Sequence, residues 1–248
     1  MDRENYNKVA NLIIDIGNTA LKACWADGIT LGKTFRYQGE NHIKFILSLT
    51  EKSRPDMIII STVRVLSEDD RALLKKECGK LLIMSMSDTD IVSAAGLPTY
   101  ITPDRAAAIM AVQYLFKGRG CTIFDFGNTL TIDFLDAEGK YLGGNISPGC
   151  VTRFRAINRY TKSLPLLDVP EEVQETGNSI VSSINSGIIS GIMFEIEGYI
   201  SRYSDNIVVF TGGDANYFAK RMKNSIFVVC NLVLMGLALI GVRYERNV

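Results

Sequence analysis

The sequence is poor in the residues that build most metal centres and nucleophilic active sites. It contains one histidine and five cysteines in 248 residues, and no two cysteines form a Cys-x-x-Cys pair. Because the cysteines are scattered and odd in number, we expect neither a disulfide framework nor a zinc site. The histidine, His42, falls in a predicted helix and is interpreted as a surface or packing residue. No Gly-x-Ser-x-Gly motif accompanies it, which argues against a serine hydrolase.

The chain also lacks net charge and a long apolar segment. Lysine plus arginine and aspartate plus glutamate are equal at 27 each, so no basic field favours nucleic acid or an anionic membrane surface. The run from Ile226 to Val242 is interrupted by Asn231 and Gly236 and is shorter than the ~20 residues that cross a bilayer. It is predicted to form a short strand, 226–230, and a buried helix. Since residues 1–5 are polar and carry no signal core, a cytoplasmic protein is expected.

What the chain does contain is an alternation of apolar strands and helical patterns. Its 47% hydrophobic content is enough for one large domain or two small ones. In the first half the patterns predict strands at 12–14, 21–26, 29–37, 57–60 and 81–84, and helices at 42–49 and 67–78. Such alternation is typical of a mixed α/β sheet.

The second half begins the same succession again. Strands are predicted at 121–124, 131–135, 141–146 and 207–210, with a long helix from 179 to 203. We expect a linker at Lys117–Gly120 and therefore two domains, 1–118 and 119–248.

The most informative feature is a repeated loop. Asp15-Ile16-Gly17-Asn18-Thr19 and Asp125-Phe126-Gly127-Asn128-Thr129 each follow an apolar strand and precede a second strand, about a hundred residues apart. Asp, Gly and Asn are common in ordinary turns, so one copy would carry little weight. Two copies in matching contexts instead indicate two structurally equivalent halves with a cleft between them.

Each residue type in the loop suits a bound triphosphate. Gly17 lets the backbone approach a phosphate without a Cβ in the way. Asn18-Thr19 offers donors to phosphate oxygens, and Lys22 adds a positive charge. Asp15 is expected to face the metal that accompanies the triphosphate, and Asp125 to face the same space.

Two further motifs are candidates for the rest of the site. Asp104-Arg105 opens a predicted helix, where the carboxylate could take a proton from an attacking hydroxyl and the arginine could hold an anion. The alternative is that Asp104 merely stabilises the start of the helix. Gly212-Gly213, after a strand, would let an adenine or ribose lie flat against the backbone, or would simply form a strand-to-helix turn.

Together these landmarks resemble the type III pantothenate kinases, within the acetate and sugar kinase/heat-shock protein/actin superfamily. The resemblance covers most of the chain and rests on residues 15–22, 104–105, 125–133, 143–149, 211–213 and 231–237. It implies an α/β fold of two similar ribonuclease H-like halves around a nucleotide cleft. It further implies ATP-dependent phosphorylation of pantothenate, the first step towards coenzyme A, with ATP and Mg²⁺.

The resemblance also implies roles by position. ATP would be bound by Asp15, Gly17, Asn18, Thr19, Lys22, Asn128, Gly212 and Gly213. Asp104 would be the base for the pantothenate hydroxyl, and the substrate would contact Tyr100, Arg105 and the position of Ile180. Asp125 would bind the monovalent cation that the family uses, K⁺ or NH₄⁺. The family is dimeric, with the neighbouring subunit helping to close the pantothenate pocket, so a homodimer is expected.

Three positions depart from the family pattern. Thr102-Pro103-Asp104-Arg105 follows Tyr100 almost directly, Asn128 replaces a threonine of the second loop, and Ile180 replaces a substrate-contacting threonine. These departures keep two alternatives open: a kinase of the same fold for another small hydroxy acid, and a nucleotide-binding regulator without turnover. The acceptor-side pair Asp104-Arg105 argues against the regulator, which has no need of it.

Overall fold

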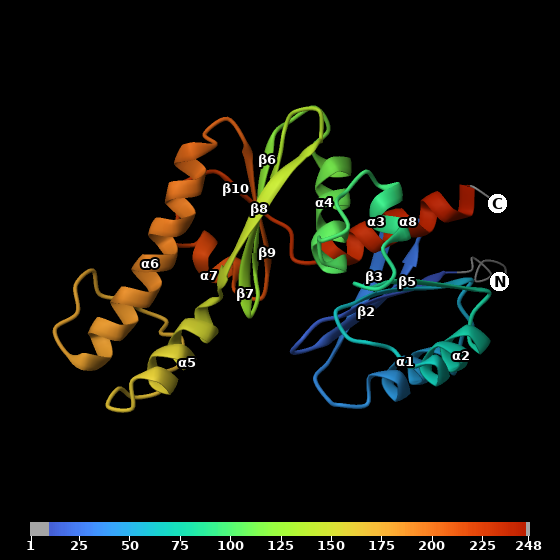
Figure 1. The fold of residues 1–248 in the computed structure, drawn as a ribbon, viewed down its shortest axis with the longest axis horizontal. Coiled ribbons are helices and arrows are strands. Elements are labelled where there is room, and N and C mark those ends of the chain that lie inside the picture. The colour runs from blue at the N-terminus through green and yellow to red at the C-terminus, as the bar shows by residue number, and fades with distance from the viewer. Residues whose placement is uncertain (1–9, 247–248) are drawn as a thin grey trace, which may run out of the picture. The chain divides into compact units, whose positions relative to one another are not determined.

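The structure is a computed structural model that describes residues 10–246 of the chain; the polar residues 1–5 lie outside this range. The chain divides into two compact units. Unit 1 comprises Met1–Leu115 and Leu232–Val248, and unit 2 comprises Phe116–Asn231. Each unit is built on its own β-sheet with helices (Figure 1).

Unit 1 contains a five-stranded sheet in the order β3-β2-β1-β4-β5. Its strands are β1 (Asn11–Ile16), β2 (Leu21–Asp27), β3 (Thr30–Tyr37), β4 (Met57–Thr62) and β5 (Lys80–Met84). The central strand β1 pairs antiparallel with β2 and parallel with β4. All six residues of β4 are buried, as expected for a strand with helices on both faces.

The helices of unit 1 cover both faces of this sheet (Figure 1). They are α1 (His42–Thr50), α2 (Glu68–Lys76), α3 (Asp90–Ala94), α4 (Pro103–Leu115) and α8 (Leu232–Arg246). Alternate residues of β1 separate the two layers: Leu12, Ile14 and Ile16 join the core beneath α1 and α2. Helices α4 and α8 pack on each other and on the opposite face. Ser67 caps α2 through a capping box with Asp70, and the helix predicted at 67–78 ends at Lys76.

Unit 2 repeats the topology of unit 1. Its strands are β6 (Cys121–Phe126), β7 (Thr129–Leu135), β8 (Tyr141–Pro148), β9 (Ile207–Gly212) and β10 (Ile226–Val228). The order is β10-β9-β6-β7-β8, with β6 antiparallel to β7 and parallel to β9. Since β6 to β10 therefore correspond one by one to β1 to β5, the prediction of two equivalent α/β halves is confirmed.

The core of unit 2 lies between its sheet and its helices. The helices are α5 (Cys150–Tyr160), α6 (Ile180–Arg202) and α7 (Ala215–Ala219). Buried isoleucines recur every four residues along α6, at 184, 188, 192, 196 and 200, and face a cluster that includes Phe124, Phe154 and Phe210. This spacing places one side of the helix on the core.

The last helix corrects the division expected from the sequence. The first unit ends at Leu115, close to the predicted boundary, but residues 232–248 belong to unit 1 and not to the second half. The reason is packing: α8 lies on α4, β1 and β4. The buried helix predicted within 226–242 is therefore present but completes the other unit. Over residues 10–246 no helix combines the length and apolarity needed to span a membrane.

Candidate functional site

The first repeated loop is the turn of the hairpin formed by β1 and β2. Asp15 lies opposite Lys22 across the two strands, and the N–H of Gly17 donates to the carbonyl of Ala20 at 3.1 Å. Asn18-Thr19 at the tip is exposed. The structure therefore brings the five predicted ATP-binding residues of this half into one hairpin.

Gly17 fits a loop that must let a ligand come close. A Cβ built on Gly17 would lie 3.4 Å from the carbonyl oxygen of Ala20, an ordinary contact, and the residue has no positive φ. Packing within the protein thus does not require glycine at this position. What glycine provides is backbone that a phosphate group can approach.

A residue that sequence reasoning missed, Arg64, supports this loop from the turn after β4. Its Nη2 donates to the carbonyl of Asn18 at 2.9 Å, and its Nη1 lies 3.4 Å from Nδ1 of His42. His42 is buried, with its ring edge-on to Tyr37 at 5.9 Å, so its interpretation as a packing residue is confirmed. Burial, and then the charge of Arg64, lowers the pKa of His42 below its usual value.

The residues predicted to act on the acceptor, Asp104 and Arg105, lie at the start of α4. Pro103 is the first helical residue, where its missing N–H costs nothing, and Asp104 follows in the first turn. The Oδ1 atom of Asp104 accepts from the N–H of Arg105 at 2.9 Å, while within residues 10–246 its Oδ2 accepts no hydrogen bond. Arg105 is buried and Tyr100 is 63% exposed. Asp104 therefore caps its helix with one oxygen and keeps the other available.

In unit 2 the end of β9 lies against Asp125. Asp125 pairs with Thr131 of β7 and Thr211 of β9. Gly212 has φ +91°, and a Cβ on it would lie 2.5 Å from both the N and O atoms of Phe126 and closer still to Oδ1 of Asp125. Only glycine allows this approach. The Gly-Gly turn is thus a strand-to-helix turn that also determines how close the backbone comes to Asp125.

The second repeated loop packs against the start of α5. The carbonyl of Asn128 accepts from the N–H of Gly149 at 2.9 Å and from Oγ1 of Thr152 at 2.6 Å. A Cβ on Gly149 would lie 2.8 Å from that carbonyl oxygen and closer to that of Gly127. The glycine-rich segment before α5 therefore fixes the conformation of the second loop.

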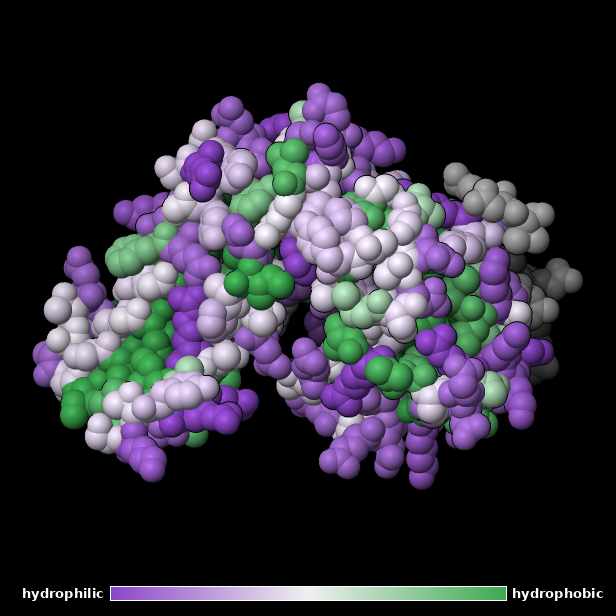
Figure 2. Space-filling model, viewed as in Figure 1, coloured by the Kyte–Doolittle hydropathy of each residue, from purple (hydrophilic) through white to green (hydrophobic). Residues whose placement is uncertain are grey.

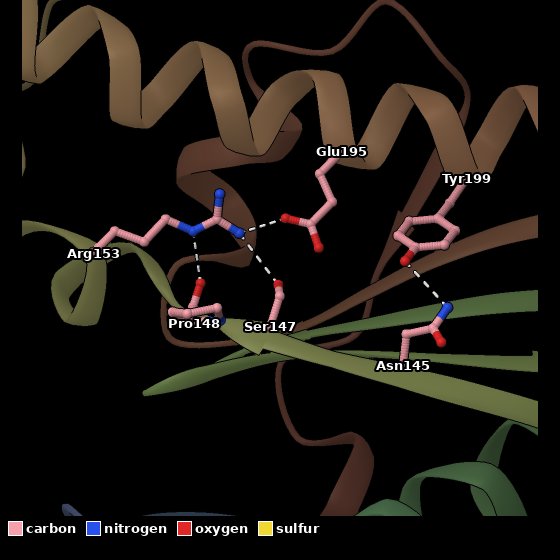
Figure 3. Close-up of polar contacts among 6 residues, drawn as sticks. All are labelled: Asn145, Ser147, Pro148, Arg153, Glu195 and Tyr199. Atoms are coloured by element: carbon pink, nitrogen blue, oxygen red, sulfur yellow. Dashed lines mark hydrogen bonds and ion pairs between the residues drawn. The ribbon is translucent and has the colours of Figure 1, made fainter. Parts of the chain in front are cut away.

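Arg153 ties this segment to α6 (Figure 3). Its Nε donates to the carbonyl of Pro148 at 2.8 Å, and its Nη2 donates to Oγ of Ser147 at 3.2 Å and pairs with Glu195 of α6. One turn further along α6, the hydroxyl of Tyr199 accepts from Asn145 at 3.1 Å. These contacts hold the end of β8 under α6, and nothing in the sequence pattern predicted them.

Two side chains near α7, Asp214 and Cys150, have raised pKa values. Burial raises the pKa of Asp214, which precedes that helix. Burial, followed by the charge of Asp214, raises the pKa of Cys150 to about 12. A thiol with such a pKa stays protonated at neutral pH, so Cys150 is a packing residue and not a nucleophile.

Ile180 lies on the exposed surface of unit 2. It is the first residue of α6, is 61% exposed, and lines a groove of about 670 Å³ between α5 and α6. The walls of the groove are mainly apolar and include Ile157, Leu164, Ile184 and Ile188. Figure 2 shows a hydrophobic area over this part of unit 2. The position expected to contact substrate is thus part of an exposed apolar surface.

The described residues offer no dedicated metal centre. Between residues 10 and 246, no group of three or more His, Cys, Asp or Glu side chains is arranged to hold an ion. Asp15 and Asp125 occupy corresponding positions on β1 and β6, each as a single carboxylate.

Known proteins are similar to this chain in sequence and in fold. The model of the type III pantothenate kinase family matches residues 11–202. Type III pantothenate kinases of Cytophaga hutchinsonii and Phocaeicola vulgatus are 34% and 36% identical, over 92% of this chain and 96% of theirs. The ADPNP-bound activator of 2-hydroxyisocaproyl-CoA dehydratase from Clostridium difficile shares the fold, with a TM-score of 0.58 at 14% identity over 96% of both chains. The chain therefore belongs to the type III pantothenate kinase family.

Proposed function

We propose that the chain phosphorylates pantothenate with ATP, giving 4'-phosphopantothenate at the start of coenzyme A synthesis, and that Asp104 is its general base. Membership of the family makes it a phosphotransferase with an alcohol group as acceptor. The observation that supports the assigned base is the state of Asp104, which keeps Oδ2 without a hydrogen bond among the described residues. A regulator that only binds nucleotide would not need such a carboxylate beside a buried arginine.

ATP is assigned to the two repeated loops and the Gly-Gly turn. In this proposal Gly17 and Asn18-Thr19 receive phosphate oxygens through backbone and side-chain donors, and Lys22 supplies charge. Asn128 and Gly212-Gly213 are assigned to bind the rest of the nucleotide. Gly17 supports this assignment, because packing within the protein does not require glycine there and its bare backbone leaves room for a phosphate.

Magnesium would neutralise charge on the phosphate groups as phosphoryl transfer proceeds. Asp15, opposite Lys22 at the base of the first loop, is assigned to face that ion, directly or through water. Asp104 would accept the proton of the pantothenate hydroxyl, and Arg105 would hold the substrate carboxylate. Catalysis of this kind depends mainly on positioning and charge stabilisation.

Asp125 is proposed to bind a monovalent cation, K⁺ or NH₄⁺. The position of Asp125 supports this assignment: it lies near the end of β6, opposite Thr131 and Thr211. Carboxylate and hydroxyl oxygens are hard ligands of the type that such cations accept. The test is the activation of turnover by potassium. Asp125→Ala should reduce turnover and remove that activation, and an undiminished response would place the cation elsewhere.

A homodimer is proposed through the apolar surface that contains Ile180. Neighbouring side chains of α6 add to it, since Val181 is 46% exposed. An apolar area of this kind is typical of a surface covered by a partner. Val181→Asp should give a monomer in light scattering, and Lys162→Asp, on the exposed segment after α5, serves as the charge-change control. Because its assigned reaction is biosynthetic, we also propose a cytoplasmic location.

Ile180 favours one alternative, a different small hydroxy acid as acceptor. An isoleucine cannot replace the hydrogen bond of a threonine, and an unpaired buried partner costs about 1–3 kcal/mol. Ile180→Thr would improve pantothenate turnover if the substrate contact is made at this position.

The experiment that tests the function is ADP release from ATP and Mg²⁺, with and without pantothenate, in potassium and then in sodium buffer. Pantothenate-dependent release that is faster in potassium is the expected result. ATP binding without pantothenate-dependent release would contradict the assigned substrate and direct the search to other hydroxy acids.

A further inference from the structure

Arg64 joins three separate segments of unit 1 at the edge of the first loop. The turn that carries it is held in place, because Oγ1 of the buried Thr62 both accepts from the N–H of Arg64 and donates to its carbonyl, each at 3.0 Å. The guanidinium then spans the carbonyl of Asn18 at 2.9 Å and Nδ1 of His42 at 3.4 Å. One side chain thus links the turn after β4, the loop between β1 and β2, and the start of α1.

His42 orients this guanidinium only while its ring is neutral. Nδ1 can then accept from Nη1, whereas a protonated ring would have a donor there and a second positive charge. Among residues 10–246, His42 contacts the guanidinium of Arg64 and the ring of Tyr37, which lies nearly perpendicular to it, and its N–H donates to the backbone carbonyl of Glu40 at 3.0 Å. The single histidine is therefore placed as a hydrogen-bond acceptor for Arg64.

We propose that Arg64 is a positioning residue for the ATP phosphates: held by His42, it fixes the carbonyl of Asn18 and so determines the conformation of the Gly17–Thr19 tip. The inference rests on the proposed function, since it assumes that this loop receives the phosphates. Two features support it. Asn18-Thr19 is exposed at the tip of a short turn, and the contact to its backbone gives that turn a fixed partner. The arginine also places a positive charge beside a loop assigned to an anion.

The first test compares Arg64→Ala and Arg64→Lys with the wild-type protein. Arg64→Ala should weaken binding of the non-hydrolysable analogue AMP-PNP, measured by calorimetry, and should raise KM for ATP by about tenfold or more. KM for pantothenate should not change. Arg64→Lys keeps the charge but cannot reach two acceptors with separate nitrogens, so it should restore only part of the affinity.

The second test isolates the role of His42. His42→Asn keeps an acceptor close to the place of Nδ1, whereas His42→Phe keeps the ring against Tyr37 and removes the acceptor. His42→Phe should therefore weaken AMP-PNP binding and His42→Asn should stay closer to the wild-type protein. Acidification should weaken AMP-PNP binding more in the wild-type protein than in His42→Asn, because only the former loses its acceptor by protonation.

Arg54 provides the matched control. It is an arginine of the same unit that also donates to backbone carbonyls, those of Cys78 at 3.0 Å and Lys76 at 3.4 Å, before the start of β4 and away from the loop. Arg54→Ala should leave AMP-PNP binding unchanged. Equal affinity of Arg64→Ala and wild-type protein for AMP-PNP would overturn the inference. Absence of pantothenate-dependent turnover in the wild-type protein would instead count against the proposed function, and the two failures are distinguishable because binding is measured without turnover.

Discussion

Gly236 of α8 lies directly against the backbone of Ala107 on α4. A Cβ on Gly236 would be 2.5 Å from the carbonyl carbon of Ala107 and 2.9 Å from its Cα, and both residues are buried. The two helices therefore cross with their main chains in contact. Any side chain at position 236 must push them apart, because a main-chain atom cannot rotate away as a flexible side chain can.

The first prediction concerns this crossing. Gly236→Ala should lower the free energy of unfolding by about 3 kcal/mol or more, since overpacking against a rigid backbone costs at least the upper part of the usual range. Gly198→Ala is the control: this glycine is exposed on α6 and has no atom within 4 Å of an added Cβ. It should gain about 0.5–1 kcal/mol. Urea unfolding of both variants measures the difference, and equal midpoints would contradict the crossing.

Gly212 allows a second prediction. Gly212→Ala places a Cβ at φ +91° and in conflict with Phe126 and Asp125. The conformation alone costs about 1–3 kcal/mol. We expect a lower melting temperature and weaker nucleotide binding. Gly213→Ala, where the nearest atom is 3.9 Å away, should melt like the wild-type protein. Equal melting temperatures of the two variants would show that position 212 does not require glycine.

The third prediction tests Asp104. Asp104→Asn should lower kcat by about 10²–10⁴-fold, because the amide cannot accept the proton of the acceptor hydroxyl. Its affinity for ATP should stay the same. Asp69→Asn, which removes a carboxylate from the first turn of α2, controls for the loss of charge at a helix start. Wild-type turnover in Asp104→Asn would show that Asp104 is not the base and only stabilises the start of α4.

A fourth prediction follows from the cysteines. Cys230 is exposed, whereas Cys24, Cys78, Cys121 and Cys150 are buried, with the pKa of Cys24 and of Cys121 raised by burial to about 11. At pH 8 a thiol with that pKa is ionised in only about one molecule in a thousand. A disulfide reagent should therefore titrate one fast thiol per native chain and five after unfolding. Cys230→Ser should remove the fast reaction, and a remaining fast thiol would reveal a site that opens readily.

The repeated strand-and-loop pattern was readable from the sequence because it depends on local rules. Apolar runs and the turn residues of the two Asp-x-Gly-Asn-Thr loops each act within a few residues. The positions of both loops, and the hairpins that carry them, are therefore as predicted.

What sequence reasoning missed depends on contacts between distant segments. Arg64 reaches Asn18 across 46 residues, and Arg153 reaches Glu195 across 42, so no local pattern reports either pair. The placement of α8 failed for the same reason: its apolar run shows that it is buried but not on which sheet. The short helices α3 and α7, of five residues each, are too brief to show a periodicity.

The return of α8 to unit 1 has a consequence for synthesis. Unit 2 is one continuous stretch, Phe116–Asn231, so all of its strands and helices are synthesised before α8. The part of unit 1 that precedes unit 2 lacks the helix that covers one face of its sheet until α8 has been synthesised. The half that carries Asp15 and Asp104 therefore completes its core only after every element of unit 2 has been synthesised.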